Sequence, residues 1–110
     1  MIDTKDITQE IYEAAHRLQN AGDSLFKLAQ AKAESERIYR RVLGIEIVKL
    51  KTEKMQTTLI PDIARGLTAD KKFERDLADA RYISGRDLTN SIQSQLSALQ
   101  SILRVQTNIG

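Results

Sequence analysis

The strongest constraint on the fold is a stripe of apolar residues that recurs every three or four positions through the first half of the chain. Its members are Ile7, Ile11, Ala14, Leu18, Ala21, Leu25, Leu28, Ala29, Tyr39, Leu43, Ile47 and Leu50. Residues at this spacing lie on one face of an α-helix, whereas a half-buried strand alternates with a period of two. The stripe therefore predicts one long amphipathic helix.

A second stripe of the same kind follows in the second half of the chain. It consists of Phe73, Leu77, Ala80, Ser84, Leu88, Ile92, Leu96, Leu99 and Leu103. Both stripes drift at a spacing nearer 3.6 than 3.5 residues, so a strict heptad repeat is not expected. No window shows the alternation of a strand, and the two stripes together predict an all-α fold.

The only proline, Pro61, lies between the stripes and predicts the turn. Proline disfavours helix at the preceding residue, and it can open a short helix that Gly66 then closes. Asp6 and Thr68 are the expected N-caps of the two long helices. We therefore expect a single domain, residues 1–110, with a helix over 6–55, a turn over 56–67 and a helix over 68–106.

The first long helix has one weak point, at residues 20–24 around Gly22. This stretch could end one helix and cap another. The apolar stripe keeps its phase across Gly22, which favours one continuous helix at a cost of roughly 1 kcal/mol for the glycine.

The stretch from Leu88 to Leu103 contains no charged residue. Exposed helices usually carry Lys and Glu on the outer face, whereas small neutral side chains allow packing on more than one side. Two long helices alone share a single contact and bury little surface. We therefore expect a long antiparallel helical hairpin that assembles into a four-helix bundle as a homo-oligomer, with a dimer favoured.

Composition argues against catalysis and against a membrane. The chain has one histidine, no cysteine and no glycine-rich phosphate loop. Glu13 and His16 have the spacing of metal ligands in di-iron bundles, but such sites need a second motif. No apolar run approaches the roughly 20 residues of a membrane span, and the polar N-terminus is unlike a secretory signal. We expect a cytoplasmic protein without catalytic, cofactor-binding or metal-binding residues.

The charge distribution suggests a possible phosphate contact. Residues 1–24 carry two basic and five acidic side chains, a net charge of −3, whereas residues 25–54 carry eight basic and four acidic ones, a net charge of +4. The candidate nucleic-acid residues are Arg37, Arg40, Arg41, Lys49, Lys51 and Lys54. Mixed charges along a helix more commonly mark a solvated face.

The turn offers a candidate protein-binding surface. The apolar residues Leu59, Ile60, Ile63 and Leu67 either cover the open end of the hairpin or form a docking knob. In the second case Asp62 and Arg65 are its polar rim. The candidate partner-binding residues are Leu59, Ile60, Asp62 and Arg65.

Two segments resemble a known family. They are the turn Leu59-Ile60-Pro61-Asp62-Ile63-Ala64-Arg65-Gly66, with Ala69-Asp70 and Phe73…Asp76-Leu77-Ala78 after it, and the ending Gln95-Leu96-Ser97-Ala98-Leu99-Gln100-Ser101-Ile102-Leu103-Arg104. From about Leu28 onward the chain is similar to small uncharacterised proteins encoded by phages and prophages of Gram-positive bacteria. The resemblance implies a bacterial host cell and a gene in an early region, beside replication and recombination functions. It implies no site residues.

The sequence thus favours a non-enzymatic phage accessory protein that self-associates and binds an unidentified protein partner through helical surfaces. One alternative is a sequence-nonspecific nucleic-acid-binding protein that uses the basic segment 37–54. Another is a virion or tail-assembly helper.

Overall fold

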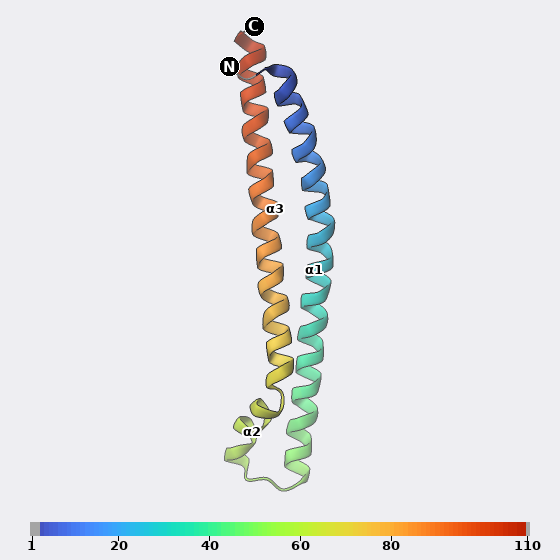
Figure 1. The fold of residues 1–110 in the computed structure, drawn as a ribbon. Coiled ribbons are helices and arrows are strands. Elements are labelled where there is room, and N and C mark those ends of the chain that lie inside the picture. The colour runs from blue at the N-terminus through green and yellow to red at the C-terminus, as the bar shows by residue number, and fades with distance from the viewer. Residues whose placement is uncertain (1–2, 110) are drawn as a thin grey trace. The chain divides into compact units, whose positions relative to one another are not determined.

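The computed structural model of the protein describes residues 3–109, and every regular element among them is helical. Helix α1 covers Thr4–Thr52, the 3-10 turn η1 Thr57–Leu59, helix α2 Ile60–Leu67 and helix α3 Ala69–Ile109 (Figure 1). The chain divides into two compact units. Unit 1 combines the chain up to Lys27 with the chain from Ile83 onward, and unit 2 is Leu28–Tyr82. The all-α prediction is confirmed.

Helix α1 begins at Thr4, two residues before the predicted start at residue 6. The carboxylate of Asp3 accepts a hydrogen bond from the Lys5 amide at 3.3 Å, and the Asp3 carbonyl accepts the Ile7 amide at 3.1 Å. Asp3 is therefore the N-cap, and the assignment of Asp6 was wrong. The prediction of a helix without a break at Gly22 is confirmed.

Helix α1 ends in a Schellman motif. The Met55 amide donates to the Leu50 carbonyl at 3.0 Å, and the Lys54 amide donates to the Lys51 carbonyl at 3.1 Å. Met55 also packs against Leu50, the apolar contact that usually accompanies this motif. Lys54 has a φ of 61°, in the left-handed region where such a cap normally has glycine.

The 3-10 turn η1 precedes helix α2, in which Pro61 occupies the first turn as its sequence position predicted. Gly66 lies inside α2, which ends at Leu67, so the prediction that this glycine closes the short helix was wrong. Ile60 and Ala64 are buried and form a core cluster with Leu50. Thr68 precedes α3 and its carbonyl accepts the Lys72 amide at 3.0 Å, as expected for an N-cap. Its side chain does not cap α3, however, because the buried hydroxyl donates to the Ala64 carbonyl at 2.8 Å.

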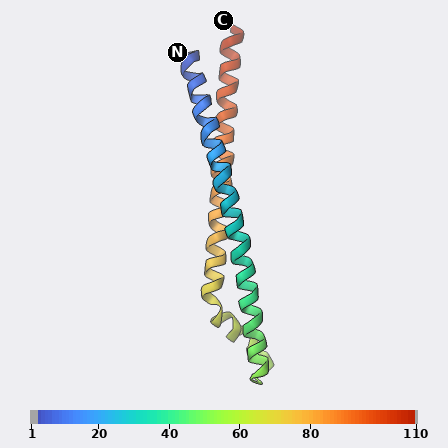
Figure 2. The ribbon, with the colours of Figure 1, turned by 90° about the vertical axis from the view of Figure 1, so that its right-hand side faces the viewer.

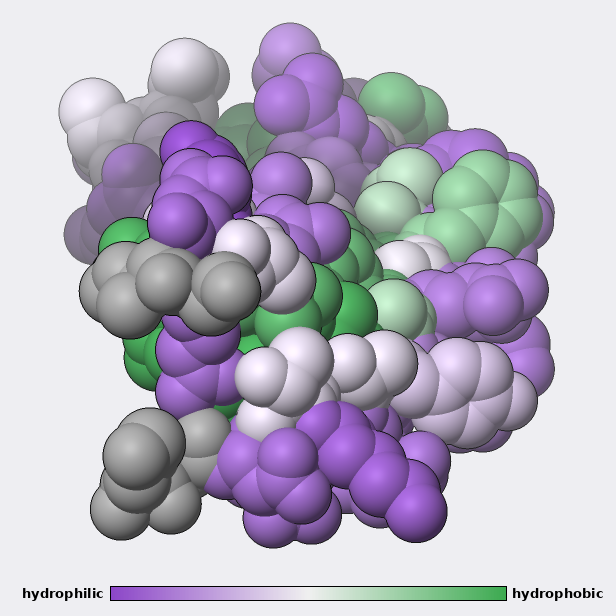
Figure 3. Space-filling model, turned by 90° about the horizontal axis from the view of Figure 1, so that it is seen from above, coloured by the Kyte–Doolittle hydropathy of each residue, from purple (hydrophilic) through white to green (hydrophobic). Residues whose placement is uncertain are grey.

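In unit 1 the two helices run antiparallel (Figures 1 and 2). The residues buried or half-buried between them are mostly apolar. Thr4 bonds to Gln106 at 3.2 Å, and Arg17 to Gln95 at 2.8 Å. The inward residues of this contact are Ile7, Ile11, Ala14, Leu18, Ala21 and Leu25 on α1, and Thr89, Ile92, Leu96, Leu99 and Leu103 on α3. In the end view of Figure 3, hydrophobic atoms lie in the middle and hydrophilic atoms around them.

These inward residues alternate steps of four and three along each helix. The average of 3.5 residues is the heptad spacing, so the expectation that no heptad repeat occurs was wrong. The physical reason is that two long helices with nearly aligned axes stay in contact along their length only if the contacting residues repeat every 3.5 residues on average.

Unit 2 also holds α1 and α3 antiparallel, but charged and aromatic side chains span part of the space between them. The ammonium of Lys32 lies 3.2 Å from the Asp79 carboxylate and 4.9 Å from the centre of the Tyr82 ring. The guanidinium of Arg75 lies 4.5 Å from the centre of the Tyr39 ring and 3.5 Å from the Glu36 carboxylate. Nearer the turn α1 packs against α2 through apolar residues, at the Leu50 cluster.

The predicted stripe of α3 is not one face. Its last four members are buried or half-buried, whereas Phe73, Leu77, Ala80, Ser84 and Leu88 are exposed. The nine positions average about 3.75 residues apart, more than the 3.6 of an α-helical turn, so the stripe drifts around the helix. The prediction was therefore wrong for the first part of α3.

Candidate interaction surfaces

Within unit 2, α3 carries an apolar surface that nothing in the described chain covers. The side chain of Phe73 is 67 % exposed, and Leu77 also lies at the surface. The neighbouring positions that turn toward α1 are taken by Arg75, Ala78 and Asp79. Large apolar residues are exposed here while the charged side chains of Arg75 and Asp79 contact α1, the reverse of the usual arrangement, so the Phe73–Leu77 surface is a candidate interaction site.

The turn divides its predicted partner-binding residues between core and surface. Ile60 is only 5 % exposed and belongs to the Leu50 cluster, so its assignment to a binding surface is corrected. Leu59 is exposed, as are Asp62 and Arg65, which form an ion pair at 3.2 Å. Burial of Ile60 follows from its place one residue before Pro61, where α2 starts against the end of α1. The turn therefore both covers the core and presents a small mixed surface.

The basic segment of α1 is partly neutralised by its own helix. Arg37 pairs with Glu34, Arg40 with Glu36 at 2.7 Å, and Lys49 with Glu46 at 3.6 Å. These contacts have the i,i+3 or i,i+4 spacing of exposed helical pairs. Among the described residues, Arg41, Lys51 and Lys54 take part in no recorded ion pair. The six candidate nucleic-acid residues thus comprise three paired and three unpaired cations.

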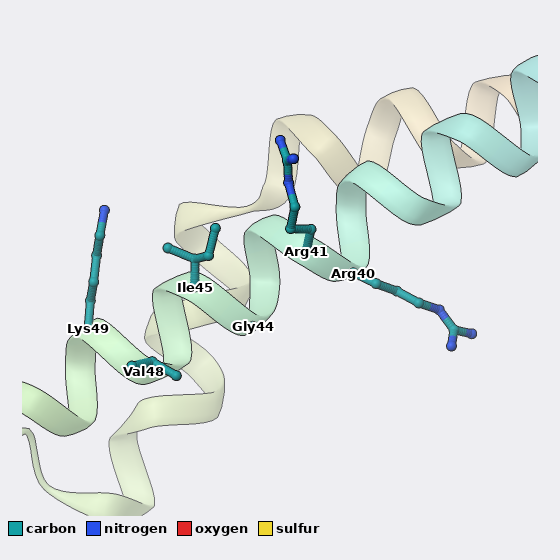
Figure 4. A pocket seen from close by; sticks show the side chains of 6 residues that line it. All are labelled: Arg40, Arg41, Gly44, Ile45, Val48 and Lys49. Atoms are coloured by element: carbon teal, nitrogen blue, oxygen red, sulfur yellow. The ribbon is translucent and has the colours of Figure 1, made fainter.

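A shallow depression of about 510 Å³ lies on this outer face of α1 (Figure 4). Its lining is Arg40, Arg41, Gly44, Ile45, Val48 and Lys49. In Figure 4, Arg41 and Lys49 extend to the same side with Ile45 between them, while Arg40 extends away. Val48 is 62 % exposed. We call Arg41, Gly44, Ile45, Val48 and Lys49 the cationic patch.

The acidic segment, residues 3–24, lies in unit 1 and has carboxylates outside ion pairs, of which Glu13 accepts a hydrogen bond from Gln9 at 3.3 Å. Asp6, Glu10 and Glu13 are exposed and take part in no recorded ion pair within the described chain. Tyr12 beside them is 69 % exposed. Glu13 and His16 share a depression of about 470 Å³ with Tyr12, but the described residues contain no group of three or more ligands that could hold a metal ion.

Two electrostatic effects are clear on the exposed surface of unit 2. The hydrogen bond from Arg37 lowers the pKa of Glu34, and the nearby charges of Arg37 and Arg41 act in the same direction. The same pair raises the pKa of Arg37, and the hydrogen bond to Asp76 raises that of Arg75. Each shift favours the charged form, so these pairs stay ionised at neutral pH.

The sequence analysis missed the exposure of Phe73 and Leu77 and the apolar part of the cationic patch. A usable signal was present in the heptad spacing of the C-terminal part of α3. Counting back from Ile92 in steps of three and four gives Thr89, Gly85, Tyr82, Ala78 and Arg75 as the residues that face α1, and leaves Phe73 and Leu77 outside.

None of the described helices contains an apolar stretch of the length that crossing a membrane requires. Comparison with protein-family models, with curated proteins and with solved structures finds no match to this chain.

Proposed function

We propose that the protein is a non-enzymatic interaction protein, which self-associates and binds another protein through the outer surfaces of its helices. One observation carries the proposal: in unit 2, Phe73 and Leu77 face outward while Arg75 and Asp79 lie between the helices. A partner protein that packs on these exposed apolar residues removes them from water, and exposed apolar patches commonly mark such contacts. The exposed Leu59 and the Asp62–Arg65 pair extend the surface at the turn.

The resemblance to phage proteins suggests where the partner is found. On this proposal the partner is a phage or host protein of an infected bacterial cell, with replication or recombination as the setting. A role as a virion or tail-assembly helper stays an alternative, which detection of the protein in purified particles would favour.

The test is capture of the partner from infected cells with tagged wild-type protein and surface variants. Phe73→Glu combined with Leu77→Glu is expected to reduce capture at least about tenfold, because it places charge in a contact that excludes water. Leu88→Glu is the matched control, since Leu88 is exposed on the same helix but in unit 1. Capture that survives the double substitution, Leu59→Asp and Arg65→Ala contradicts the proposal.

Nucleic-acid binding remains a second candidate because Arg41, Lys51 and Lys54 are free of ion pairs. Phosphate contacts of this kind weaken steeply with salt. Titration of labelled DNA and RNA at 50 mM and 200 mM salt tests it, and absence of binding at the lower concentration removes it.

A further inference from the structure

We propose that the cationic patch on α1 binds the acidic segment of a second copy of this chain, so that two α1 helices pair antiparallel. The inference rests on the self-association part of the proposed function and names its surface. Charge complementarity identifies the occupant: the acidic segment has a net charge of −3, and residues 25–54 have a net charge of +4. A parallel pair in register would place like charges together, whereas an antiparallel pair places opposite charges together.

The charged groups on the two surfaces also match in spacing. Arg41 and Lys49 are eight residues apart, which is about 12 Å along a helix. Asp6 and Glu13 are seven residues apart, about 10.5 Å along a helix. In the antiparallel arrangement Glu13 of one copy faces Arg41 of the other, and Asp6 then falls opposite Val48, one residue from Lys49. Asp6, Glu13 and Arg41 have no recorded ion pair, and Lys49 has only a 3.6 Å contact with Glu46.

Apolar groups lie between the charges on both sides. Ile45 stands between Arg41 and Lys49 (Figure 4), and Val48 is exposed next to it. Gly44 has no side chain and therefore forms part of the depression, with nothing within 4 Å of the position that a Cβ would take. The exposed ring of Tyr12 adjoins Glu13 and supplies the apolar group that covers this depression. The apolar side chains between the cations favour a protein helix as the ligand, because binding of a nucleic-acid phosphate backbone needs only positive charge.

The test is charge reversal with rescue, followed by sedimentation equilibrium at 50 mM NaCl. Arg41→Glu and Glu13→Arg are each expected to raise the dissociation constant at least about tenfold, because like charges then meet in the contact. An equimolar mixture of the two variants restores opposite charges at both symmetry-related contacts, and its dissociation constant is expected within about threefold of the wild-type value.

The controls carry the same changes in net charge elsewhere on the surface. Arg104→Glu and Glu53→Arg alter exposed residues that have no recorded ion pair, and both variants are expected to associate like the wild type. Raising NaCl to 500 mM is expected to weaken association of the wild type, since salt screens exposed charges. Circular dichroism verifies that all variants remain helical.

Two results overturn the inference. One is a mixture that stays dissociated, and the other is a wild-type protein that is monomeric at 50 mM NaCl while Arg41→Glu alters only the binding of DNA. Neither affects partner capture through Phe73 and Leu77, so failure of the dimer contact and failure of partner binding are distinguishable.

Discussion

At the residue scale, Lys54 is the one described residue other than glycine with a positive φ. The left-handed conformation costs a residue with a Cβ about 1–2 kcal/mol, and glycine largely escapes this cost at the expense of more backbone entropy in the unfolded chain. We therefore expect Lys54→Gly to raise the free energy of unfolding by up to about 1 kcal/mol in urea denaturation. Lys51→Gly, inside the last turn of α1, is the control and is expected to lower it by a similar amount. A destabilised Lys54→Gly variant contradicts the assigned cap.

Glu34 gives a prediction about pH at the same scale. Its pKa is lowered in the folded protein, first by the hydrogen bond from Arg37, so its stabilising effect is present above the unfolded-state pKa. This contribution is lost as the pH falls through the folded-state value, below 4.5. NMR titration of the Glu34 carboxyl carbon is expected to show a midpoint below 4.5 in the wild type, and Arg37→Gln should return it toward that value. Identical midpoints in the two proteins would show that the pair does not form in solution.

At the element scale, the continuity of α1 through Gly22 predicts the effect of removing this glycine. No atom lies within 4 Å of the position that an added Cβ would take, so alanine fits without rearrangement. Gly22→Ala is expected to raise the free energy of unfolding by about 1 kcal/mol in urea denaturation. The reverse change at an exposed site of the same helix, Ala15→Gly, should lower it by about as much. An unchanged Gly22→Ala variant would indicate that α1 breaks at this glycine.

The same scale shows what periodicity could predict. The stripe of α1 was read correctly because its members are all buried or half-buried, from Ile7 to Leu50, although other apolar residues of the same helix such as Phe26 are exposed. The short helix at Pro61 was also predictable, because proline fits the first turn of a helix, whereas its end at Leu67, beyond Gly66, was not. In the first part of α3 apolar character and burial separate. Tyr82 and Arg75 turn inward because each stacks with or pairs to a group on α1, which no period reveals in advance.

The candidate surfaces were less predictable than the helices for the same reason. Whether Ile60 packs into the core or faces a partner depends on where α2 lies against the end of α1, a tertiary fact. The basic segment was visible in the sequence, but the neutralisation of Arg40 by Glu36 depends on side-chain conformations. The sequence shows that Ile45 and Val48 are apolar, but only the structure shows that they are exposed beside the cations of the cationic patch.

At the scale of the whole molecule, the proposed self-association predicts that thermal stability depends on protein concentration. A ligand present at 100 times its dissociation constant stabilises the folded state by about 2.7 kcal/mol, and a second copy of the chain acts as such a ligand. Each kilocalorie shifts the melting temperature of a chain of this size by about 4–8 °C. A hundredfold rise in concentration above the dissociation constant is therefore expected to raise the melting temperature of the wild type by roughly 10 °C or more.

The Arg41→Glu variant tests whether the dependence of the melting temperature on concentration comes from the proposed dimer contact. Arg41 is exposed and takes part in no ion pair of the described chain, so Arg41→Glu loses only its attraction to the exposed Glu34 and should melt nearly like the dilute wild-type protein. Because its dissociation constant is raised, its melting temperature should stay nearly constant over the same concentration range, as followed by circular dichroism. The Arg104→Glu control should retain the wild-type slope. Equal slopes for Arg41→Glu and the wild type would mean that the copies meet through another surface, with the exposed Phe73 and Leu77 of α3 as the first to test.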